Sequence, residues 1–420
     1  MQVAIVGGGF GGLAAAKALG RASDIEITLV DRRNHHLFQP LLYQVAMAGL
    51  SPAEISAPIR SLLSSQRNTR VRQERVHAVK PALRTIEVDS GEIGYDRLIV
   101  AAGARHTYFG HDEWEEHAPG LKSLEEATEI RRRVLLAYER AEMETDAAAQ
   151  KALLTFVVVG GGPTGVELAG ALGEMSRFTL AADFRNIDPA LARVILIEAG
   201  PRILPSFPEA QSRRAMRDLE GLGVQVWTSS AVTGVDARGV NVGDERIRAA
   251  TTLWAAGVQA SPLGRSLGVP LDRQGRVRVE PDLSVPGHPE IFVIGDLARL
   301  DDAAGVPLPG MAPVAIQQGR HVARTILREL RGDAREPFRY RDRGQMATIG
   351  RSRALCDLGR VRFAGFAAWV VWLVVHIYFL VSFKNRLFVV LQWAWSYLTF
   401  RRGARLIVAA DWRAAGEGRR

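Results

Sequence analysis

The fold is decided by the stretch Gly7-Gly8-Gly9-Phe10-Gly11-Gly12, which has a counterpart at Gly160-Gly161-Gly162-Pro163-Thr164-Gly165. Each copy reads G-x-G-x-x-G, follows a short apolar run and precedes a run of helix-forming residues. Glycine is needed in such a turn because the backbone must bend tightly and approach a pyrophosphate closely. The N-terminus of the following helix then offers free N–H groups and the positive end of its dipole to that anion. The sequence therefore predicts two dinucleotide-binding units in one chain.

An acidic residue closes the next expected strand of each unit. Asp31 follows Gly12 by 19 positions, whereas Glu198 follows Gly165 by 33 positions. We attribute the longer spacing to an insert around residues 176–192. A carboxylate at this place is expected to accept a hydrogen bond from the adenosine ribose. Because strand, glycine turn, helix and terminal acid occur together, both stretches predict dinucleotide binding more specifically than the glycine pattern alone does.

Length and composition indicate a folded protein of two or three domains. The 420 residues exceed one ordinary core, and 47% hydrophobic with 24% charged residues is typical of globular chains. The net charge of +9 lies mostly in residues 361–420, which hold nine Lys and Arg against two Asp and Glu. The same segment holds five of the eight tryptophans. Basic residues beside aromatic and aliphatic runs indicate membrane contact, so we expect no nucleic-acid partner.

The C-terminal apolar run allows more than one arrangement. Residues 363–383 contain no Asp, Glu, Lys or Arg, and as one helix they would span ~31 Å, about the core of a bilayer. Lys384-Asn385-Arg386 interrupts the run, and the apolar residues 387–400 are too short to span. Hydropathy alone favours neither a spanning helix nor a pair of helices lying in the membrane surface. A buried core helix fits less well, because clustered Trp with flanking Arg is unusual in a core.

The cysteine and histidine residues exclude two classes of site. Cys356 is the single cysteine, so the chain can form neither an internal disulfide nor a redox-active cysteine pair. A reducing compartment fits this usage. The histidines lack metal-ligand spacing with carboxylate or thiol partners, so we expect no metal site.

Taken in order, several motifs resemble those of the type II NADH:quinone oxidoreductases, the single-subunit respiratory NADH dehydrogenases. They are Asp31–Ala46, Gly160–Glu167, Leu253-Trp254-Ala255-Ala256-Gly257, Gly295-Asp296, Ala312–Gly319, Phe383–Leu387 and Gln392–Leu398. The resemblance covers essentially the whole chain. It implies an α/β fold with two Rossmann-like dinucleotide-binding domains, the second inserted in the first, and a C-terminal membrane-associating helical segment. The implied FAD-binding domain is residues 1–120 and 265–335, the NADH-binding domain 121–264 and the membrane-anchoring domain 336–420.

The resemblance also implies which residues hold the two dinucleotides. FAD would be bound tightly but without a covalent bond, and NADH would bind as a substrate. The FAD-binding residues would be Gly7, Gly9, Phe10, Gly11, Gly12, Asp31, Arg32, Ala102, Gly103, Asp296, Ala312 and Pro313. The NADH-binding residues would be Gly160, Gly162, Pro163, Thr164, Gly165, Glu198, Ala256 and Gly257. A carboxylate at Glu198 favours NADH over NADPH, because it repels a 2′-phosphate.

Glu167 and Gln317 are the catalytic residues that the resemblance implies. Glu167 would lie beside nicotinamide and flavin, and Gln317, Gln318 and Lys384 would contact quinone. The family pattern at this helix start is A-Q-x-A-x-Q, but proline stands at the first glutamine position here, in Ala312-Pro313-Val314-Ala315-Ile316-Gln317. The flavin contacts of this stretch would therefore be made mainly by the backbone.

The implied reaction is hydride transfer from NADH to FAD and two-electron transfer to a membrane quinone, either ubiquinone or menaquinone, without proton pumping. The resemblance favours in-plane C-terminal helices over a spanning one. It implies a homodimer bound to the cytoplasmic face of the cell membrane through residues 361–405. One alternative is an NAD(P)H-dependent reductase of a soluble electron carrier, which would need no apolar tail. Another is a non-catalytic flavoprotein that senses NADH and docks at membranes.

Overall fold

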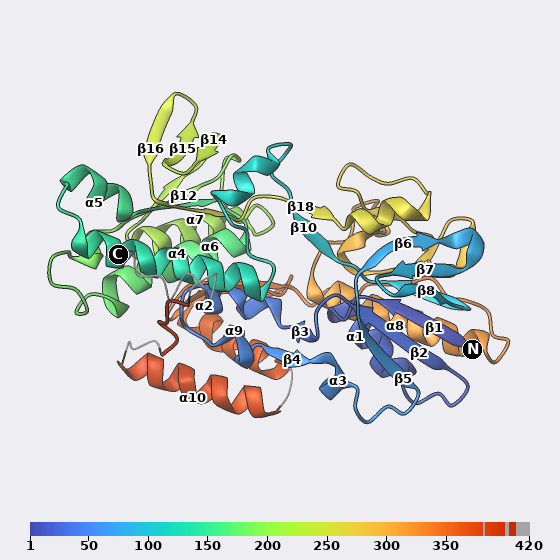
Figure 1. The fold of residues 1–420 in the computed structure, drawn as a ribbon. Helices are drawn as coiled ribbons and strands as arrows, with labels where there is room; N and C mark the ends of the chain where they lie inside the picture. The colour runs from blue at the N-terminus through green and yellow to red at the C-terminus, as the bar shows by residue number, and fades with distance from the viewer. Residues whose placement is uncertain (381–382, 400–402, 409–420) are drawn as a thin grey trace, which may run out of the picture. The chain divides into compact units, whose positions relative to one another are not determined.

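The computed structural model describes residues 1–380, 383–399 and 403–408, without the side chains of residues 383–384 and 395–399. These residues form two compact units, each built from three segments of the chain (Figure 1). Unit 1 comprises Met1–Leu37, Ser56–Arg105 and Val258–Arg343. Unit 2 comprises Phe38–Ile55, His106–Gly257 and Gly344–Arg420. The bounds of these units differ from those of the three expected domains, which stay a prediction.

Unit 1 is built on a six-stranded sheet in the order β20-β21-β9-β1-β2-β5. The strands are β1 (Gln2–Val6), β2 (Glu26–Asp31), β5 (Thr69–Gln73), β9 (Arg97–Val100), β20 (Ser284–Val285) and β21 (His288–Val293). All neighbours pair in parallel except β20, which is antiparallel to β21. The inner strands are largely apolar because both faces of the sheet are covered: in β1, Val3 and Ile5 belong to one core cluster and Ala4 and Val6 to the other.

Two helices of unit 1 pack against one another through glycine. α1 (Phe10–Leu19) follows the first glycine turn, and α8 (Ala312–Glu329) begins one residue before the Pro313 that the sequence indicated. A Cβ added at Gly319 of α8 would lie 2.2 Å from the Gly11 carbonyl oxygen of α1. The two backbones can approach this closely only because neither residue carries a side chain.

The other elements of unit 1 are short. They are β3 (His35–Leu37), β4 (Ser56–Pro58), α3 (Ile59–Leu62), β6 (Val76–Lys80), η3 (Pro81–Leu83), β7 (Thr85–Val88), β8 (Gly91–Gly94), β10 (Ala104–His106), β18 (Val258–Ala260), η7 (Pro262–Leu267), β19 (Val277–Arg278), η8 (Gly295–Leu297) and β22 (Ala298–Arg299). Among them, β6, β7 and β8 form an antiparallel sheet that joins the core at Val79 and Ile86.

Unit 2 contains the second parallel sheet, in the order β13-β12-β11-β17. Its strands are β11 (Thr155–Val159), β12 (Arg193–Ile197), β13 (Val224–Trp227) and β17 (Thr251–Trp254). α6 (Pro163–Glu174) follows the second glycine turn and continues into one π-helical turn, Met175–Thr179. The expected insert lies here: residues 176–192 leave α6, are held by a 2.6 Å hydrogen bond between the Tyr138 and Ser176 hydroxyls, and return to β12.

Unit 2 also contains the elements that surround this sheet. They are η1 (Gln39–Leu41), α2 (Leu42–Ala46), η2 (Pro52–Glu54), η4 (Asp112–Glu116), α4 (Leu124–Met143), α5 (Ala147–Leu153), η6 (Pro189–Leu191), α7 (Glu209–Glu220) and the antiparallel β14 (Val232–Asp236), β15 (Gly239–Val242) and β16 (Glu245–Arg248). Among these elements, α4 packs against α2, α5 and β17.

The C-terminal part of unit 2 is an antiparallel sheet followed by two helices. The sheet consists of β23 (Gln345–Gly350), β24 (Arg353–Asp357) and β25 (Arg362–Gly365), and the helices are α9 (Phe366–Phe379) and α10 (Phe383–Thr399). β23 lies directly on α6: a Cβ added at Gly170 would be 1.7 Å from the Ile349 carbonyl oxygen. Gly170 therefore sets the distance between the C-terminal sheet and the nucleotide-binding helix.

The helix within the apolar run of residues 363–383 is shorter than the composition of the run suggested. The first residues of the run belong to β25. Gly365, at φ +83°, then turns the chain into α9, which has 14 residues. Among the described residues, no helix combines the length and apolarity needed to cross a membrane. The α/β class with two dinucleotide-type units agrees with the expectation from sequence.

Candidate functional site

The first glycine turn of unit 1 has the geometry that a pyrophosphate loop needs. Gly7 has φ +100°, and a Cβ there would lie 2.3 Å from the Ala101 carbonyl oxygen, so only glycine fits. The Gly8 N–H donates to the Asp31 carboxylate over 2.6 Å. A Cβ at Gly9 would meet no protein atom within 4 Å, which leaves the N-terminus of α1 open to an anion.

The second turn, in unit 2, repeats this geometry. Gly160 has φ +108° and lies against the backbone of Ala255 and Ala256. The Gly161 N–H donates to the Glu198 carboxylate over 2.6 Å, and the Gly200 N–H donates to its other oxygen over the same distance. The insert after α6 therefore leaves the acid in the same place relative to the turn as in unit 1.

His36 stabilises the first turn in a way that the glycine pattern alone did not predict. Its Nδ1 lies 2.9 Å from the Gly8 carbonyl oxygen, and its ring packs edge-on against Phe10 at 5.1 Å. Burial lowers the pKa of His36, so the neutral ring donates from Nδ1. The Gly8 peptide is thus held at both ends, by Asp31 at its N–H and by His36 at its carbonyl.

The glutamines of α8 each have a partner within unit 1. Gln318 is buried, and its amide oxygen accepts a 2.7 Å hydrogen bond from the Gly295 N–H, next to Asp296. The amide of Gln317 pairs with the backbone of Arg341 in both directions, each at 3.0 Å. Gln318 therefore positions the turn that carries Asp296, and the oxygen of each amide accepts a backbone hydrogen bond.

Unit 2 encloses a cavity of about 120 Å³ beside α6, called the α6 cavity below. It lies between α2, α6, the end of β23, α9 and α10. Its lining residues are Tyr43, Gln44, Met47, Gly49, Glu167, Ala171, Glu174, Thr348, Ile349, Gly350, Arg351, Trp369, Trp372, Leu373 and Trp393. The cavity thus combines aromatic walls with two carboxyl groups and a guanidinium.

Glu167 is the strongest candidate for proton chemistry in this cavity. It lies in the second turn of α6, two residues after the glycine stretch. Burial raises the pKa of Glu167 to about 8, and a hydrogen bond from the Thr348 backbone opposes part of that rise. A carboxyl group in this state carries a proton near neutral pH and can exchange it.

The cavity also contains polar residues that are not among the expected site residues. Glu174 accepts a short hydrogen bond from the Arg351 N–H. The Gln44 amide donates to the Tyr43 hydroxyl over 2.9 Å and accepts from the Trp393 indole N–H over 2.7 Å. Glu174 could have been found from sequence, because it stands seven positions after Glu167 and so lies on the same face of a helix.

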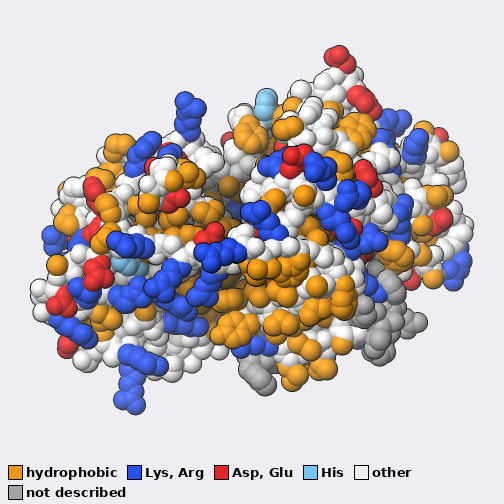
Figure 2. Space-filling model, turned by 180° about the vertical axis from the view of Figure 1, so that it is seen from behind, with side chains coloured by type: hydrophobic (Ala, Val, Ile, Leu, Met, Phe, Trp, Pro, Cys, Tyr) orange, Lys and Arg blue, Asp and Glu red, His pale blue; other side chains and the backbone are white. Residues whose placement is uncertain are grey.

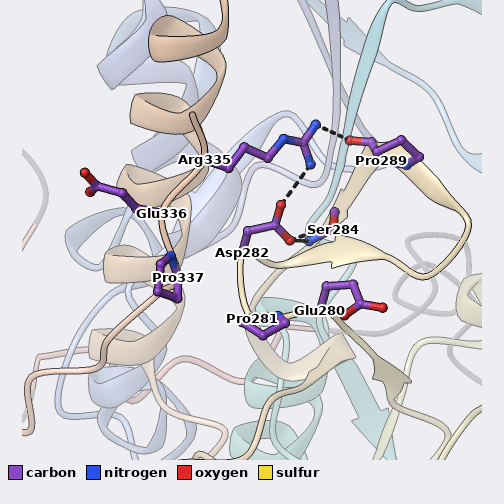
Figure 3. A pocket seen from close by; sticks show the side chains of 8 residues that line it. All are labelled: Glu280, Pro281, Asp282, Ser284, Pro289, Arg335, Glu336 and Pro337. Atoms are coloured by element: carbon purple, nitrogen blue, oxygen red, sulfur yellow. Dashed lines mark hydrogen bonds and ion pairs between the residues drawn. The ribbon is translucent and has the colours of Figure 1, made fainter. Parts of the chain in front are cut away.

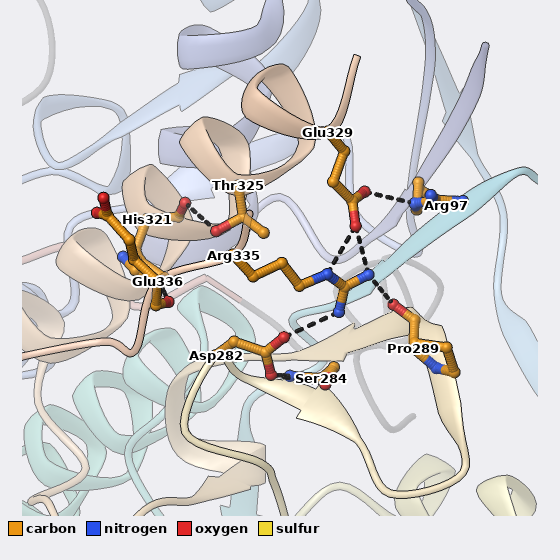
Figure 4. A network of polar contacts seen from close by, with 9 residues as sticks. All are labelled: Arg97, Asp282, Ser284, Pro289, His321, Thr325, Glu329, Arg335 and Glu336. Atoms are coloured by element: carbon orange, nitrogen blue, oxygen red, sulfur yellow. Dashed lines mark hydrogen bonds and ion pairs between the residues drawn. The ribbon is translucent and has the colours of Figure 1, made fainter. Parts of the chain in front are cut away.

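A larger, open hollow of about 510 Å³ lies in unit 1 near the amino ends of its strands (Figure 3). Arg335 projects beside it and bonds Asp282 at 2.9 Å, Glu329 at 2.6 Å and the Pro289 carbonyl at 2.7 Å. Arg97, at the start of β9, bonds the same Glu329 at 2.8 Å (Figure 4). This network ties the end of α8 to the sheet. The hollow is lined by none of the expected site residues.

Comparison with known proteins identifies the chain. The family model described as pyridine nucleotide-disulphide oxidoreductase matches residues 1–319, and that of the NDH2 C-terminal domain matches residues 343–402. The chain is 46% identical to the type II NADH:quinone oxidoreductase Ndh of Mycobacterium tuberculosis, over 96% of this chain and 89% of that one. It is 44% identical to NdhA of the same organism, over 97% and 89%. The chain belongs to the type II NADH:quinone oxidoreductase family.

A solved structure supports the fold within this family. NDH2 of Plasmodium falciparum in complex with NADH superposes with a TM-score of 0.89 at 20% identity, over 97% of this chain and 99% of that one. The α/β fold and the activity expected from the sequence, FAD-dependent NADH:quinone oxidoreduction, are confirmed by the family assignment.

The expected cofactor-binding residues lie just after the carboxyl ends of parallel strands or at the starts of helices. Ala102 and Gly103 follow β9, Arg32 follows β2, and Ala312 and Pro313 open α8. In unit 2, Pro163 and Thr164 open α6, and Ala256 and Gly257 follow β17. Lys384 is part of α10, but its side chain lies outside the described residues. Contact of these residues with a ligand stays a prediction.

Glu167→Gln tests the protonation of this carboxyl through stability. Because the pKa is raised from 4.5 to about 8 in the folded state, the folded protein binds a proton that the unfolded chain releases. The free energy of unfolding of the wild type should therefore fall, relative to that of Glu167→Gln, as pH rises from about 4.5 to about 8, by on the order of 2–4 kcal/mol. Urea unfolding at a series of pH values measures this difference. A difference that does not change with pH would contradict the raised pKa.

Proposed function

We propose that this protein oxidises NADH bound at Gly160–Gly165 and reduces a membrane quinone by way of FAD bound at Gly7–Gly12, without pumping protons. The observation that carries the proposal is the pair of matched turns, each with a carboxylate bonded to its second glycine N–H. Two such sites in one chain suit one permanently bound and one exchanging dinucleotide. Family membership supports the direction of electron flow.

The residues of unit 1 fit FAD. The left-handed Gly7, the open approach at Gly9 and the α1 N-terminus suit its pyrophosphate, and Asp31 suits its adenosine ribose. Asp296, on the turn held by Gln318, suits the ribityl chain. When bound, FAD supplies the hydride acceptance and the two-electron donation that protein side chains lack. The protein's part is to bind and orient it.

Glu167 is the proton-exchanging group of the proposed mechanism. Formation of one quinol from one NADH takes up one proton from water in addition to the hydride. A carboxyl with a pKa near 8 can give up and regain that proton at neutral pH. Its position in the second turn of α6, two residues after Gly165, supports a role near the nicotinamide half of the nucleotide, with Glu198 on the adenosine side.

The proposed quinone site contains residues of α8 and α10. The family resemblance places Gln317, Gln318 and Lys384 at ubiquinone or menaquinone. Gln317 is partly exposed, so its amide could exchange the Arg341 backbone for a quinone carbonyl. Buried Gln318 would act indirectly, by positioning the Gly295-Asp296 turn.

Helices α9 and α10 supply the proposed membrane contact. Apolar residues at every fourth position of α9 are exposed, including Val374 at 57% and Tyr378 at 68%, and Leu391 of α10 is 57% exposed. Figure 2 shows apolar side chains gathered in the lower part of the molecule seen from behind, where α9 and α10 lie. Arg386 lies over the Tyr378 ring at 5.8 Å and bonds the last turn of α9, as expected at a membrane–water boundary.

The exposed apolar area argues against a reductase of a soluble electron carrier. Patches of this kind mark protein or membrane contacts, and the basic C-terminal segment favours an anionic membrane surface. We place the protein on the cytoplasmic face of the cell membrane, in the plane of the surface. The homodimer rests on the family resemblance alone. A non-catalytic NADH sensor would share the fold, so quinone-dependent turnover decides between an enzyme and a sensor.

Purified protein in detergent should carry FAD and oxidise NADH rapidly only when a short-chain quinone is added. Flavin absorbance after purification measures the cofactor, and NADH absorbance with and without quinone measures turnover. Rates are expected in the usual enzyme range, about 1–10³ s⁻¹. Bound FAD without quinone-dependent turnover would favour the NADH-sensing alternative and contradict the proposal.

The wild type should prefer NADH to NADPH by at least about tenfold in kcat/KM, because the Glu198 carboxylate repels the 2′-phosphate. The nearby Arg202 cannot easily offset this, since its guanidinium donates to the carbonyls of Phe207 and Pro205 at 3.0 and 2.8 Å. Glu198→Gln keeps an acceptor for the Gly161 N–H and should narrow the preference by raising NADPH use. The exposed Glu209→Gln serves as the control. If the wild type has equal kcat/KM values for NADH and NADPH, the predicted NADH preference is refuted.

Acidic substitutions on the outer faces of α9 and α10 should weaken membrane binding. Val374→Asp and Leu391→Asp remove apolar area that the bilayer would bury, and each should reduce binding to anionic lipid vesicles by about tenfold or more. Leu83→Asp is the matched control, because Leu83 is 67% exposed but lies in unit 1. Co-sedimentation with vesicles measures binding. Equal retention of all three variants would show that the contact lies elsewhere.

A further inference from the structure

Three residues of α6 line the α6 cavity along one face of the helix. Glu167, Ala171 and Glu174 stand at positions i, i+4 and i+7, and all three border the cavity. Over seven residues a helix rises about 10 Å, so the two carboxyl groups are too far apart for a direct hydrogen bond. The residue between them is an alanine, whose single methyl group leaves the space between the carboxyls unfilled.

The same short stretch of backbone anchors both carboxyl groups. The Thr348 N–H bonds Glu167, and the Arg351 N–H bonds Glu174. Between them, Gly350 permits the close approach, because a Cβ there would lie 2.9 Å from a Glu174 carboxylate oxygen. The two carboxyl groups therefore stand at opposite ends of one lane, which is the part of the α6 cavity that runs past Ala171, beside the contact between α6 and β23.

The cavity has the room and the polar groups that bound water requires. Its volume of about 120 Å³ exceeds the ~10–15 Å³ that a single water needs. The Tyr43 hydroxyl and the Gln44 amide add hydrogen-bonding groups from α2. Among the described side chains, the titratable groups that line the cavity are Glu167, Glu174, Arg351 and Tyr43. The lining residues from α9 and the described part of α10 are Trp369, Trp372, Leu373 and Trp393, and none of these side chains titrates.

We propose that the α6 cavity holds a chain of water molecules through which Glu174 supplies protons to Glu167. This inference rests on the proposed function, in which NADH, one proton and quinone yield NAD⁺ and quinol. The O–H bond of Glu167 breaks as its proton goes to the quinone oxygen. The resulting carboxylate regains a proton through the water chain from Glu174, which takes one from bulk water. No electrons pass along the lane.

Two substitutions interrupt the lane in different ways. Ala171→Leu fills the space between the two carboxyl groups. Glu174→Gln removes the proton carrier at the end of the lane opposite Glu167. Each should slow reoxidation of the bound flavin by a short-chain quinone by about tenfold or more. Reduction of the flavin by NADH consumes no proton from water and should keep its rate. Stopped-flow absorbance measures both half-reactions. Glu174→Asp retains a carboxyl and should recover part of the loss.

A second measurement does not depend on turnover. After transfer to D₂O, the carboxyl stretch of protonated Glu167 shifts as deuterium replaces hydrogen, and Glu167→Gln identifies the infrared band. Exchange should be slower in Ala171→Leu and Glu174→Gln than in the wild type. The control is Ala152→Leu, the same change in α5 of the same unit, outside the cavity lining. Unchanged exchange in both lane variants would overturn the proposal.

The kinetic constants separate this role from two others. If Ala171→Leu raises the KM for quinone and leaves kcat unchanged, the cavity receives the quinone ring and the water lane is wrong. If the rates of both half-reactions fall together, the substitutions act on the fold, and the proposed water chain is again refuted. Absence of quinone turnover in the wild type would instead refute the proposed function, a result that the exchange measurement distinguishes from failure of the lane.

Discussion

The contact between α6 and β23 at Gly170 is the constraint on which the candidate site depends. A glycine inside a helix costs about 0.5–1 kcal/mol relative to alanine, and α6 accepts that cost where the Ile349 carbonyl oxygen lies against it. The approach brings the Thr348 N–H to Glu167 and the Arg351 N–H to Glu174. One helix thereby serves two purposes: its N-terminus belongs to the proposed nucleotide site, and its side forms the wall of a cavity with two carboxyl groups.

The glycine turns were predictable from sequence because their determinants are local. Strand, turn, helix and acid follow one another along the chain, and the physical demands on each residue leave few alternatives. The insert between α6 and β12 shows that the geometry of the turn is kept even when the spacing in sequence changes. It changes the spacing of Glu198 in sequence but not its bond to Gly161, because the parallel pairing of β11 and β12 fixes where the acid emerges. Family resemblance added the identity of the two nucleotides.

The α6 cavity could not be predicted in the same way, because its walls come from segments far apart in sequence. Tyr43 and Gln44, Glu167, Thr348 and Trp393 meet only once the tertiary structure has formed. No periodicity in any one segment records that meeting. The glutamines of α8 show the same limit, since the Arg341 backbone that pairs with Gln317 is 24 positions away and belongs to no motif. The start of α9 also escaped prediction, because β25 pairs with β24 and claims residues that composition assigned to a helix.

Helix α9 links the cavity to the proposed membrane surface. It is apolar on every side: Ala368 and Trp372 are buried, whereas Val374 and Tyr378 are exposed. A helix that is apolar all round is stable only if both faces are covered, and the protein covers one of them. The inward tryptophans line the α6 cavity, while the outward residues leave an area that a bilayer can bury. In the proposed function, quinone arrives from that bilayer and protons arrive from water. A thin wall of aromatic side chains between lipid and cavity would therefore keep the proton supply close to the membrane without opening the cavity to lipid.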